Sequence, residues 1–309
     1  MAEYIEKRVL SSDGVHELCG RVYVPEGTPR GYFQVVHGMT EHIARYDAFM
    51  RQMADDGYIC FGYDHLGHGH TAKTPDEWGF IAHKDGWVHL CRDVGRFAEA
   101  VKAAYPAADG DVRPYVLMGH SMGSFIVRMA VGYEGVKPDK LIIMGTGGAN
   151  PAAGIGLAVI RMIKVLRGEK HVSNLVDKLA FGSYNDRFKA ENDRRAWLTT
   201  DREVRRVYDA DPLCTFRFSV SAMEDLVTLN KRANKAEWFR AMDRELPILL
   251  VSGSDDPVGN YGAGVREVYN KLKAQGCDVT LHLYEGARHE ILNDACRAQV
   301  VADIRAFIQ

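Results

Sequence analysis

The chain has 309 residues, of which 46% are hydrophobic and 26% are charged, and its formal net charge is −2. These values are ordinary for a globular protein with a substantial core, and the length allows one large α/β domain or two smaller ones. Because the charge is close to neutral, nothing indicates binding to nucleic acid, and we expect no such partner.

The sequence gives no sign of secretion or of a membrane anchor. Residues 1–10 carry scattered charges in place of the apolar run of a secretion signal. No window approaches the roughly 20 apolar residues of a membrane-spanning helix. The six cysteines form no CxxC pair, so a zinc or redox site is not indicated. We therefore expect a cytoplasmic protein with reduced cysteines, no metal and no cofactor.

The chain begins with an expected β-hairpin. Strand-like residues 4–10 and 17–24 flank the turn "SSDG", whose Asp13-Gly14 step is a strong hairpin signal. The two strands are therefore predicted to pair antiparallel at one edge of a sheet.

Strands and helices then alternate along the chain. Helix-compatible segments at about 45–56, 90–106 and 122–133 separate the strand-like runs, and further helical segments follow the last two strands. The strand-like runs are residues 31–39, 58–67, 115–119, 140–147, 246–254 and 279–287. This alternation predicts an α/β fold with a mostly parallel central sheet and helices on both faces.

One region breaks the alternation. Residues 151–216 are compatible with helices and contain no convincing strand. An insertion of this kind is expected to form a cap over the carboxyl ends of the strands, where α/β proteins bind ligands. We therefore divide the chain into a catalytic domain, residues 1–150 and 217–309, and a helical cap, residues 151–216.

The stretch "VLMGHSMGS" (residues 116–124) ends a strand on a serine that lies between glycines. A nucleophilic serine must stand clear of its own backbone, and a sharp strand-to-helix turn achieves this while crowding the positions two before and two after it. Gly119 and Gly123 meet that requirement around Ser121. A helix that begins at Met122 would aim its free N–H groups at a developing oxyanion.

An acid and a base follow later strands. His289 comes shortly after the last predicted strand, and "GSDDP" places Asp255 and Asp256 directly after the strand before it. A carboxylate there can accept a hydrogen bond from His289 and stabilise its imidazolium form. The order Ser, Asp, His, each after a predicted strand, is that of an α/β-hydrolase. The residues themselves leave the choice between the two aspartates open.

On these motifs the chain resembles the monoacylglycerol lipase and lysophospholipase branch of the α/β-hydrolases, the serine-aminopeptidase-like group, over nearly its whole length. "HGMTEHIARY" (37–46) looks like the branch's H-G-x-x-E-H-x-x-R-Y signature. "YDHLGHGHT" (63–71) resembles its D-x-x-G-H-G-x-S segment, with Thr71 where serine is usual. "WLTTDREVRRVYDADPLC" (197–214) looks like the end of the cap in bacterial members. The resemblance implies the α/β-hydrolase fold with a helical cap insertion.

The resemblance also implies roles for single residues. The acid is the fourth residue of G-x-x-D, which selects Asp256, and the last family histidine corresponds to His289. The oxyanion hole is implied at the backbone N–H groups of Met39 and Met122. We expect the other residues of these motifs to support the loops rather than to react, namely His37, Gly38, Glu41, Gly119, His120 and Gly123.

The segment "IGLAVIRMIKVLRG" (155–168) is apolar around most of a helix, with Arg161, Lys164 and Arg167 as its charges. Such a helix is not expected to stand alone in water. The first interpretation is a cap helix packed on the catalytic domain, and the alternative adds a transient contact with a membrane surface, which basic residues favour where the lipid is anionic. Both interpretations place an apolar lining above the serine, so Ile160 and Ile163 are expected to line an acyl site.

The leading interpretation is a serine esterase that hydrolyses lipid-like esters, monoacylglycerol or lysophospholipid, through Ser121, His289 and Asp256. One alternative is an amidase or peptidase that uses the same triad. A non-catalytic binding member of the fold is disfavoured because all three triad residues are present. The expected partner is a small lipid or ester molecule, and the sequence does not give its acyl length, its head group or the oligomeric state.

Overall fold

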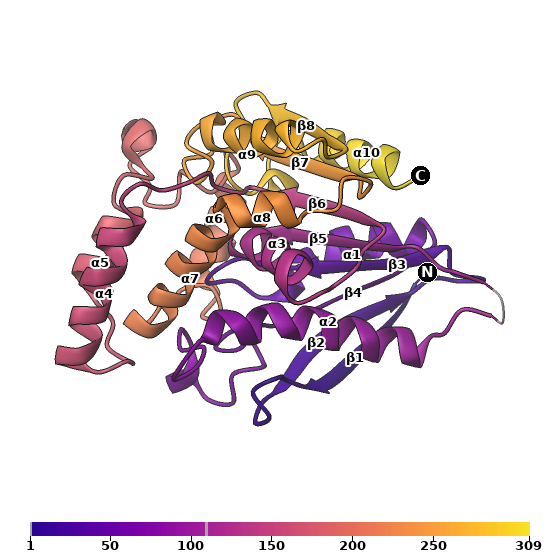
Figure 1. Ribbon diagram of the computed structural model, residues 1–309, viewed down its shortest axis with the longest axis horizontal. Helices are drawn as coiled ribbons and strands as arrows, with labels where there is room; N and C mark the ends of the chain where they lie inside the picture. The colour runs from indigo at the N-terminus through magenta and orange to yellow at the C-terminus, as the bar shows by residue number, and fades with distance from the viewer. Residues whose placement is uncertain (1, 109–110) are drawn as a thin grey trace.

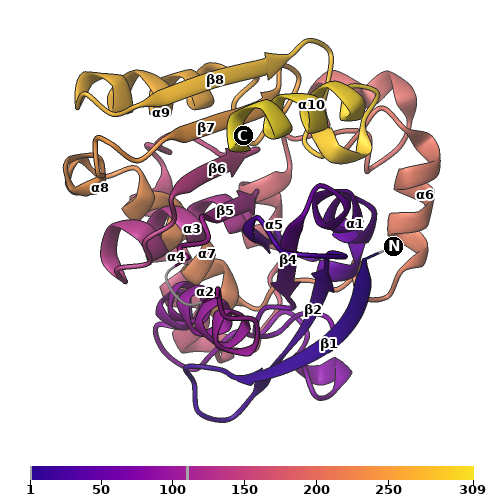
Figure 2. The same cartoon turned by 90° about the vertical axis from the view of Figure 1, so that its right-hand side faces the viewer.

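The computed structural model describes residues 2–108 and 111–309. A sheet of eight described strands forms the centre of the molecule, in the order β1-β2-β4-β3-β5-β6-β7-β8 (Figures 1 and 2). The strands are β1 (Glu3–Leu10), β2 (Glu17–Val24), β3 (Gly31–Val36), β4 (Tyr58–Tyr63), β5 (Tyr115–His120), β6 (Lys140–Met144), β7 (Ile248–Gly253) and β8 (Val279–Tyr284).

The edge hairpin and the mostly parallel sheet are both confirmed. β1 pairs antiparallel with β2, and β2 pairs antiparallel with β4. All pairings from β4 to β8 across the sheet are parallel. In the hairpin turn, Gly14 has a φ of +72° and the Asp13 carboxylate accepts the N–H groups of Val15 and His16 at 2.8 and 2.9 Å. A glycine and a self-capping aspartate are what such a turn requires.

Helices cover both faces of the sheet, as predicted. They are α1 (Asp47–Asp55), α2 (Gly86–Ala104), α3 (Met122–Tyr133), α4 (Ala153–Arg167), α5 (Asn174–Phe181), α6 (Arg202–Ala210), α7 (Val220–Ala233), α8 (Ala236–Ala241), α9 (Ala263–Ala274) and α10 (Arg297–Ile308). One buried hydrophobic cluster joins the sheet to α2, α3, α7 and α9, and a second joins it to α1 and α10.

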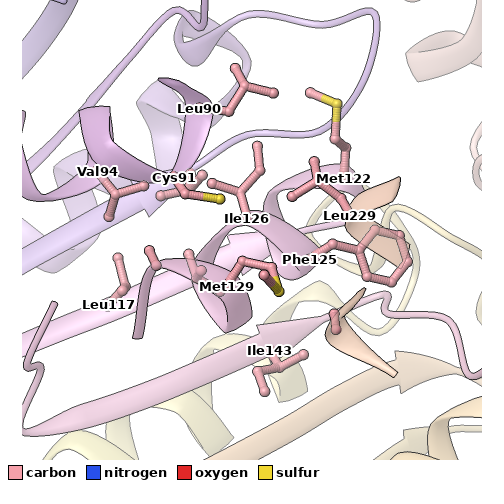
Figure 3. Packing of buried hydrophobic residues seen from close by; sticks show 14 of the residues in the cluster. Leu90, Cys91, Val94, Leu117, Met122, Phe125, Ile126, Met129, Ile143 and Leu229 are labelled. Atoms are coloured by element: carbon pink, nitrogen blue, oxygen red, sulfur yellow. The ribbon is translucent and has the colours of Figure 1, made fainter. Parts of the chain in front are cut away.

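The alternation along β5 explains how one short strand serves both clusters. Tyr115 and Leu117 belong to the first cluster, whereas Val116 and Met118 belong to the second. Side chains of successive strand residues point to opposite faces, so an unbroken apolar run is what a strand covered on both sides needs. Figure 3 shows Leu117 in the first cluster near Met129 of α3, with Ile126, Phe125 and Met122 further from it.

The chain between β6 and β7 carries the helices of the expected cap. Residues 151–216, which the structure describes in full, contain α4, α5, a 3-10 turn at Asp186–Glu191, and α6, without a strand. In Figure 1, α4 and α5 stand at one end of the sheet, and α4 packs along α7. The insertion follows β6 directly, so it leaves the sheet at the carboxyl ends of the parallel strands.

One helix boundary differs from the expectation. α2 begins at Gly86, four residues before the expected start at residue 90. The side chain of Asp225, on α7, accepts the backbone N–H of Trp87 at 3.0 Å and so satisfies a free donor in the first turn of α2. The helix therefore gains its first turn from a residue far away in the sequence.

Candidate active site

The turn between β5 and α3 holds Ser121 in a strained backbone conformation. Its φ and ψ are +56° and −120°, a region that residues with a side chain adopt rarely. Two bonds fix the turn: Ser121 N–H donates to the Met144 carbonyl at 3.0 Å, and the Ser121 carbonyl accepts the Ser124 N–H at 2.9 Å. The side chain is thereby projected from the end of a strand at the start of a helix.

Close backbone contacts explain the flanking glycines. A Cβ atom on Gly119 would lie 2.3 Å from the Gly123 carbonyl oxygen, and one on Gly123 would lie 2.1 Å from the Val36 carbonyl oxygen. A Cβ atom on Gly38 would lie 3.0 Å from the Cβ of Ser121. The glycines thus let three chain segments, the ends of β3 and β5 and the start of α3, meet around the serine.

The structure brings His289 and Asp256 together from separate loops. His289 Nδ1 lies 2.9 Å from Asp256 Oδ2, and the two side chains are 3% and 0% exposed. Asp256 Oδ1 accepts the Val258 N–H at 2.8 Å, which orients the carboxylate. A buried carboxylate so placed fixes the ring so that the other ring nitrogen, Nε2, is free to take a proton. The neighbouring Asp255 is only half-buried, and its backbone N–H, rather than its carboxylate, bonds to the loop before His289, at the Ala287 carbonyl.

Two other rings lie close to the imidazole of His289. The centroid of the His120 ring is 4.7 Å away and that of the Trp197 ring is 5.2 Å away. A Cβ atom on Gly145, the residue after Met144, would lie 3.3 Å from His289 Cε1. The end of β6 and the residue after it therefore contact both the backbone of Ser121 and the ring of His289.

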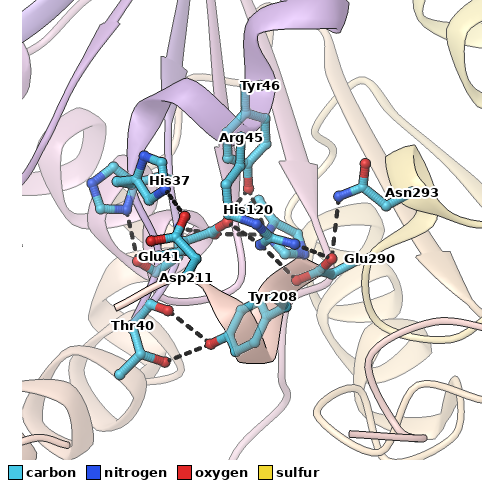
Figure 4. A network of polar contacts seen from close by, with 12 residues as sticks. His37, Thr40, Glu41, Arg45, Tyr46, His120, Tyr208, Asp211, Glu290 and Asn293 are labelled. Carbon is cyan, nitrogen blue, oxygen red and sulfur yellow. Dashed lines mark hydrogen bonds and ion pairs between the residues drawn. The ribbon is translucent and has the colours of Figure 1, made fainter. Parts of the chain in front are cut away.

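A buried polar network supports these loops (Figure 4). Glu41 accepts the N–H of Gly38 at 2.5 Å, the hydroxyl of Tyr46 at 2.9 Å and a guanidinium N–H of Arg45 at 2.7 Å. Arg45 also donates both terminal nitrogens to the carboxylate of Glu290, at 2.7 and 2.6 Å. A buried arginine between two carboxylates ties the loop after β3 to the loop that carries His289.

His120 lies inside the same network. Its Nδ1 is 2.8 Å from the Tyr46 hydroxyl and its Nε2 is 3.2 Å from the His289 carbonyl oxygen. Burial alone would lower the pKa of His120, but the hydrogen bond to Glu41 and the charge of that carboxylate raise it. Burial opposes the ionisation of Glu41, yet His120 and Arg45 hold its pKa well below the usual range. The pair therefore favours a charged glutamate beside a protonated histidine.

His37 is held neutral. Its Nε2 accepts the backbone N–H of His65 at 3.1 Å, so its proton resides on Nδ1, which donates to the Gly38 carbonyl at 2.8 Å. Burial, together with neighbouring His65 and His68, lowers the pKa of His37 well below its usual value. These contacts fit the supporting role expected for His37, and those of Glu41 and His120 fit it equally.

Two backbone N–H groups beside Ser121 remain available. In the chain as described, residues 2–108 and 111–309, neither Met39 N nor Met122 N donates a hydrogen bond to another group. Met122 is the first residue of α3, where helix geometry leaves the N–H unpaired and the dipole is positive. Free donors in this position can donate hydrogen bonds to an oxyanion without breaking existing bonds.

The two expected lining residues of the cap lie on the inner side of α4. Ile160 is 3% exposed and belongs to the hydrophobic cluster that also contains Met122 and Phe125, and Ile163 is half-buried against that cluster. The start of α3 and the cap helix α4 therefore contribute to the same buried cluster.

One trio of side chains has a composition that could bind a metal. Among the described residues, His42, Asp211 and Cys214 bring one potential ligand atom each within 4.8 Å of one another. His42 Nε2 is already 2.8 Å from Asp211 Oδ2, and burial raises the pKa of the Cys214 thiol. The Arg45 guanidinium acts on the same thiol, and its positive charge opposes a second cation there.

Several residues that shape the site were not singled out in the sequence. Arg45 and Tyr46 are part of the H-G-x-x-E-H-x-x-R-Y signature, but the signature alone did not indicate what these two residues do. Glu290 carries no such signal, and Trp197 is the first residue of the motif at 197–214, which gave it no role. Glu290 meets Arg45 across 245 positions of sequence, and Trp197 meets His289 from the cap.

Comparisons with known proteins identify the family of this chain. A family model described as "Serine aminopeptidase, S33" matches residues 27–295. A monoacylglycerol lipase from Mycolicibacterium smegmatis is 27% identical over 293 residues, 93% of this chain and 91% of the relative. A monoglyceride lipase from Mus musculus is 28% identical over 283 residues, 91% and 82% of the two chains.

The fold is shared with solved structures. A highly thermostable carboxyl esterase from Bacillus coagulans, solved with glycerol, matches with a TM-score of 0.91 at 30% identity over 99% of this chain and 97% of that one. The α/β-hydrolase fold and the family resemblance expected from the motifs are therefore confirmed. Since the family model covers most of its length, the chain belongs to the serine aminopeptidase S33 family of α/β-hydrolases.

Proposed function

We propose that this chain is a carboxylic ester hydrolase that cleaves lipid-like esters, monoacylglycerol or lysophospholipid, through Ser121, His289 and Asp256. The observation that carries the proposal is the buried 2.9 Å contact between His289 and Asp256, at the same edge of the sheet as the strained turn of Ser121. The names of the relatives, monoacylglycerol lipase and carboxyl esterase, support the ester class.

The proposed reaction has two halves. Ser121 Oγ attacks the ester carbonyl while its proton passes to His289 Nε2, and the N–H groups of Met39 and Met122 stabilise the negative charge on the carbonyl oxygen. The tetrahedral intermediate collapses, and the alcohol leaves with the proton from His289. Water then attacks the acyl-enzyme with His289 as base, which releases the fatty acid and restores the serine.

The test is covalent labelling. A fluorophosphonate should label the wild-type protein once, and Ser121→Ala should abolish both the label and ester hydrolysis, with a loss of about 10⁴-fold or more. Ser183→Ala, an exposed cap position, is the matched control and should keep both. If Ser121→Ala kept a tenth of the activity, the nucleophile would be another residue.

The family name leaves amide cleavage as the competing activity. Steady-state rates on an ester and an amide that share one acyl group distinguish the two, because the same triad must expel a much poorer leaving group from the amide. We expect the ester to be strongly preferred. A higher kcat/KM on the amide would make the chain an amidase or peptidase.

The outer side of the cap favours a lipid surface as the source of substrate. α4 exposes apolar side chains at Ile155, Met162, Val165 and Leu166, a spacing that places them on one face, and α5 adds Leu175 and Leu179. The exposed basic residues Arg167, Lys170 and Lys178 lie in the same segment. In the described part of the chain, none of the helices has the length and apolarity that a bilayer crossing requires. An apolar helix face with basic flanks fits binding at the surface of anionic lipid.

Vesicle flotation tests this contact. The protein should float with vesicles that contain anionic phosphatidylglycerol and less with phosphatidylcholine alone, and Val165→Ser with Leu166→Ser should weaken flotation. Val112→Ser, at an exposed valine outside the cap, is the control. Equal flotation of both variants would show that α4 does not contact the lipid.

A further inference from the structure

The cap forms hydrogen bonds with the backbone of the loop that carries His289. The N–H of His289 donates to the Trp197 carbonyl at 3.4 Å, and the N–H of Glu290 donates to the Leu198 carbonyl at 2.7 Å. The hydroxyl of Thr199 donates to the Asn293 carbonyl at 2.7 Å. Cap residues 196–200 therefore run alongside the catalytic loop and hold it.

Arg288 strengthens this attachment. Its guanidinium donates to the Ala196 carbonyl at 2.5 Å, pairs with Glu191 and lies 4.1 Å from the centroid of the Phe188 ring. The residue before the catalytic histidine is thus bound to the cap by a charge pair, a main-chain contact and an aromatic ring. The cap segment cannot shift without moving this loop.

Trp197 is the cap residue that meets the imidazole itself. Its ring centroid is 5.2 Å from that of His289, with 38° between the ring planes. Its backbone N–H donates to the Asn185 side chain at 3.0 Å, and the ring packs edge-on against Tyr184 at 5.0 Å. These contacts hold the backbone and the ring of Trp197 in place.

The other groups around His289 leave its transient charge only partly compensated. Asp256 pairs with Nδ1, and the centroid of the His120 ring is 4.7 Å from that of His289. A protonated His120 repels an imidazolium, although Glu41 is its partner. Arg288 and Glu290, in the same loop, are paired with Glu191 and Arg45. Burial and the charge of Asp256 raise the pKa of Tyr184, so this phenol stays neutral.

We propose that Trp197 is a positioning residue for His289: its indole fixes the imidazole and stabilises the imidazolium that forms when Ser121 gives up its proton. The inference rests on the proposed function and names a contribution of the cap to that chemistry. A cation within about 6 Å of an indole centroid is stabilised by the π system, and more so where water is excluded. The neutral ring gains less, so the contact acts mainly on the charged state.

The test compares Trp197→Leu with Trp197→Phe, and uses Trp87→Leu, a half-buried tryptophan on α2, as the matched control. The readout is the second-order rate constant for labelling by a small fluorophosphonate from pH 5 to 9, because such a probe does not need the acyl contacts of the cap. Trp197→Leu should lower the plateau about tenfold and move the acid limb to lower pH by about half a unit. The direction follows because a less stabilised imidazolium loses its proton more readily.

Trp197→Phe keeps an aromatic face and should stay within about threefold of wild type. The proposal is wrong if the leucine variant loses rate with an unmoved acid limb, or if phenylalanine rescues neither property. Should Trp197→Leu fail to fold, Trp197→Met supplies a long side chain without a π face. Absence of labelling in the wild-type protein would instead refute the proposed serine nucleophile, so the two failures are distinguishable.

Discussion

Two regions of the molecule are built in opposite ways: the floor of the site, which is the turn around Ser121, and the arm of the cap, which consists of α4 and α5. In the floor, backbones approach so closely that Gly119 and Gly123 have no room for a Cβ atom, and every neighbour is buried. In the arm, Gly156 has open space around it and Val165 is 84% exposed. The floor therefore has one permitted geometry, as positioned catalysis requires, whereas the arm tolerates change and presents an apolar surface.

The largest effect is expected in the floor, at the acid. Asp256→Asn should lower kcat about 10⁴-fold, because an asparagine can hold His289 with the proton on the wrong nitrogen. Asp255→Asn is the matched control, since that side chain is half-buried and does not meet the ring. Ester hydrolysis under saturating substrate gives the ranking, and a greater loss in Asp255→Asn would assign the acid to the other residue.

The same small substitution should have opposite signs in the two regions. Gly123→Ala forces a methyl group to within 2.1 Å of the Val36 oxygen and should cost about 3 kcal/mol of unfolding free energy. Gly156→Ala lies inside α4 with nothing within 4 Å, so it should add about 0.5–1 kcal/mol. Urea unfolding of both variants checks this, and equal changes would remove the distinction between floor and arm.

The inner side of α4 should matter for long substrates only. Ile160→Ser with Ile163→Ser should lower kcat/KM about tenfold on dodecanoyl esters and little on acetyl esters, because each methylene removed from water contributes about 0.8 kcal/mol. Val165→Ser with Leu166→Ser changes the outer side and is the control. A uniform drop from C2 to C12 would mean that the inner face only supports the fold.

The stability contributed by Asp225, on the helix α7 against which α4 packs, should depend on pH. Burial raises the pKa of Asp225 to about 7, despite the N–H of Trp87. An unfolded aspartate titrates near 4, so the folded state holds the extra proton between about pH 4 and 7 and stability falls as the pH rises through that range. Asp225→Asn carries no charge and should be about 1 kcal/mol more stable than wild type at pH 8.

At pH 5 only part of that range has been crossed, so the two proteins should differ less than at pH 8. Urea unfolding at the two pH values measures it. An equal change at both would show that the carboxylate is not the cause.

Features set by neighbours in sequence could be predicted. The crowding around Ser121 is local, so the glycine spacing alone predicted the turn. The alternation of strands and helices likewise predicted the sheet and the edge hairpin, because each element shows its own periodicity. The position of His289 after the last strand followed from the same pattern.

Contacts between distant segments could not be predicted. The first turn of α2 depends on Asp225, which is 138 positions away, and the link between Arg45 and Glu290 leaves no pattern in either segment. The sequence did not show which side of α4 is buried, because apolar residues occur around most of the helix. Packing on α7 buries Ile160 and leaves Val165 exposed. Trp197 belongs to the motif at 197–214, but its contact with His289 depends on how the end of the cap packs against the loop after β8.

The hydrogen bonds from residues 197 and 198 to the catalytic loop limit how this enzyme can be rebuilt. An insertion can be excised or exchanged where the backbone it leaves behind keeps its partners. Here, removal of residues 151–216 would strip the loop of His289 of its N–H acceptors and leave Arg288 without a counterion. A chimaera that exchanges α4 and α5 alone respects those bonds. The boundary for recombination therefore lies inside the insertion, before residue 184, rather than at its ends.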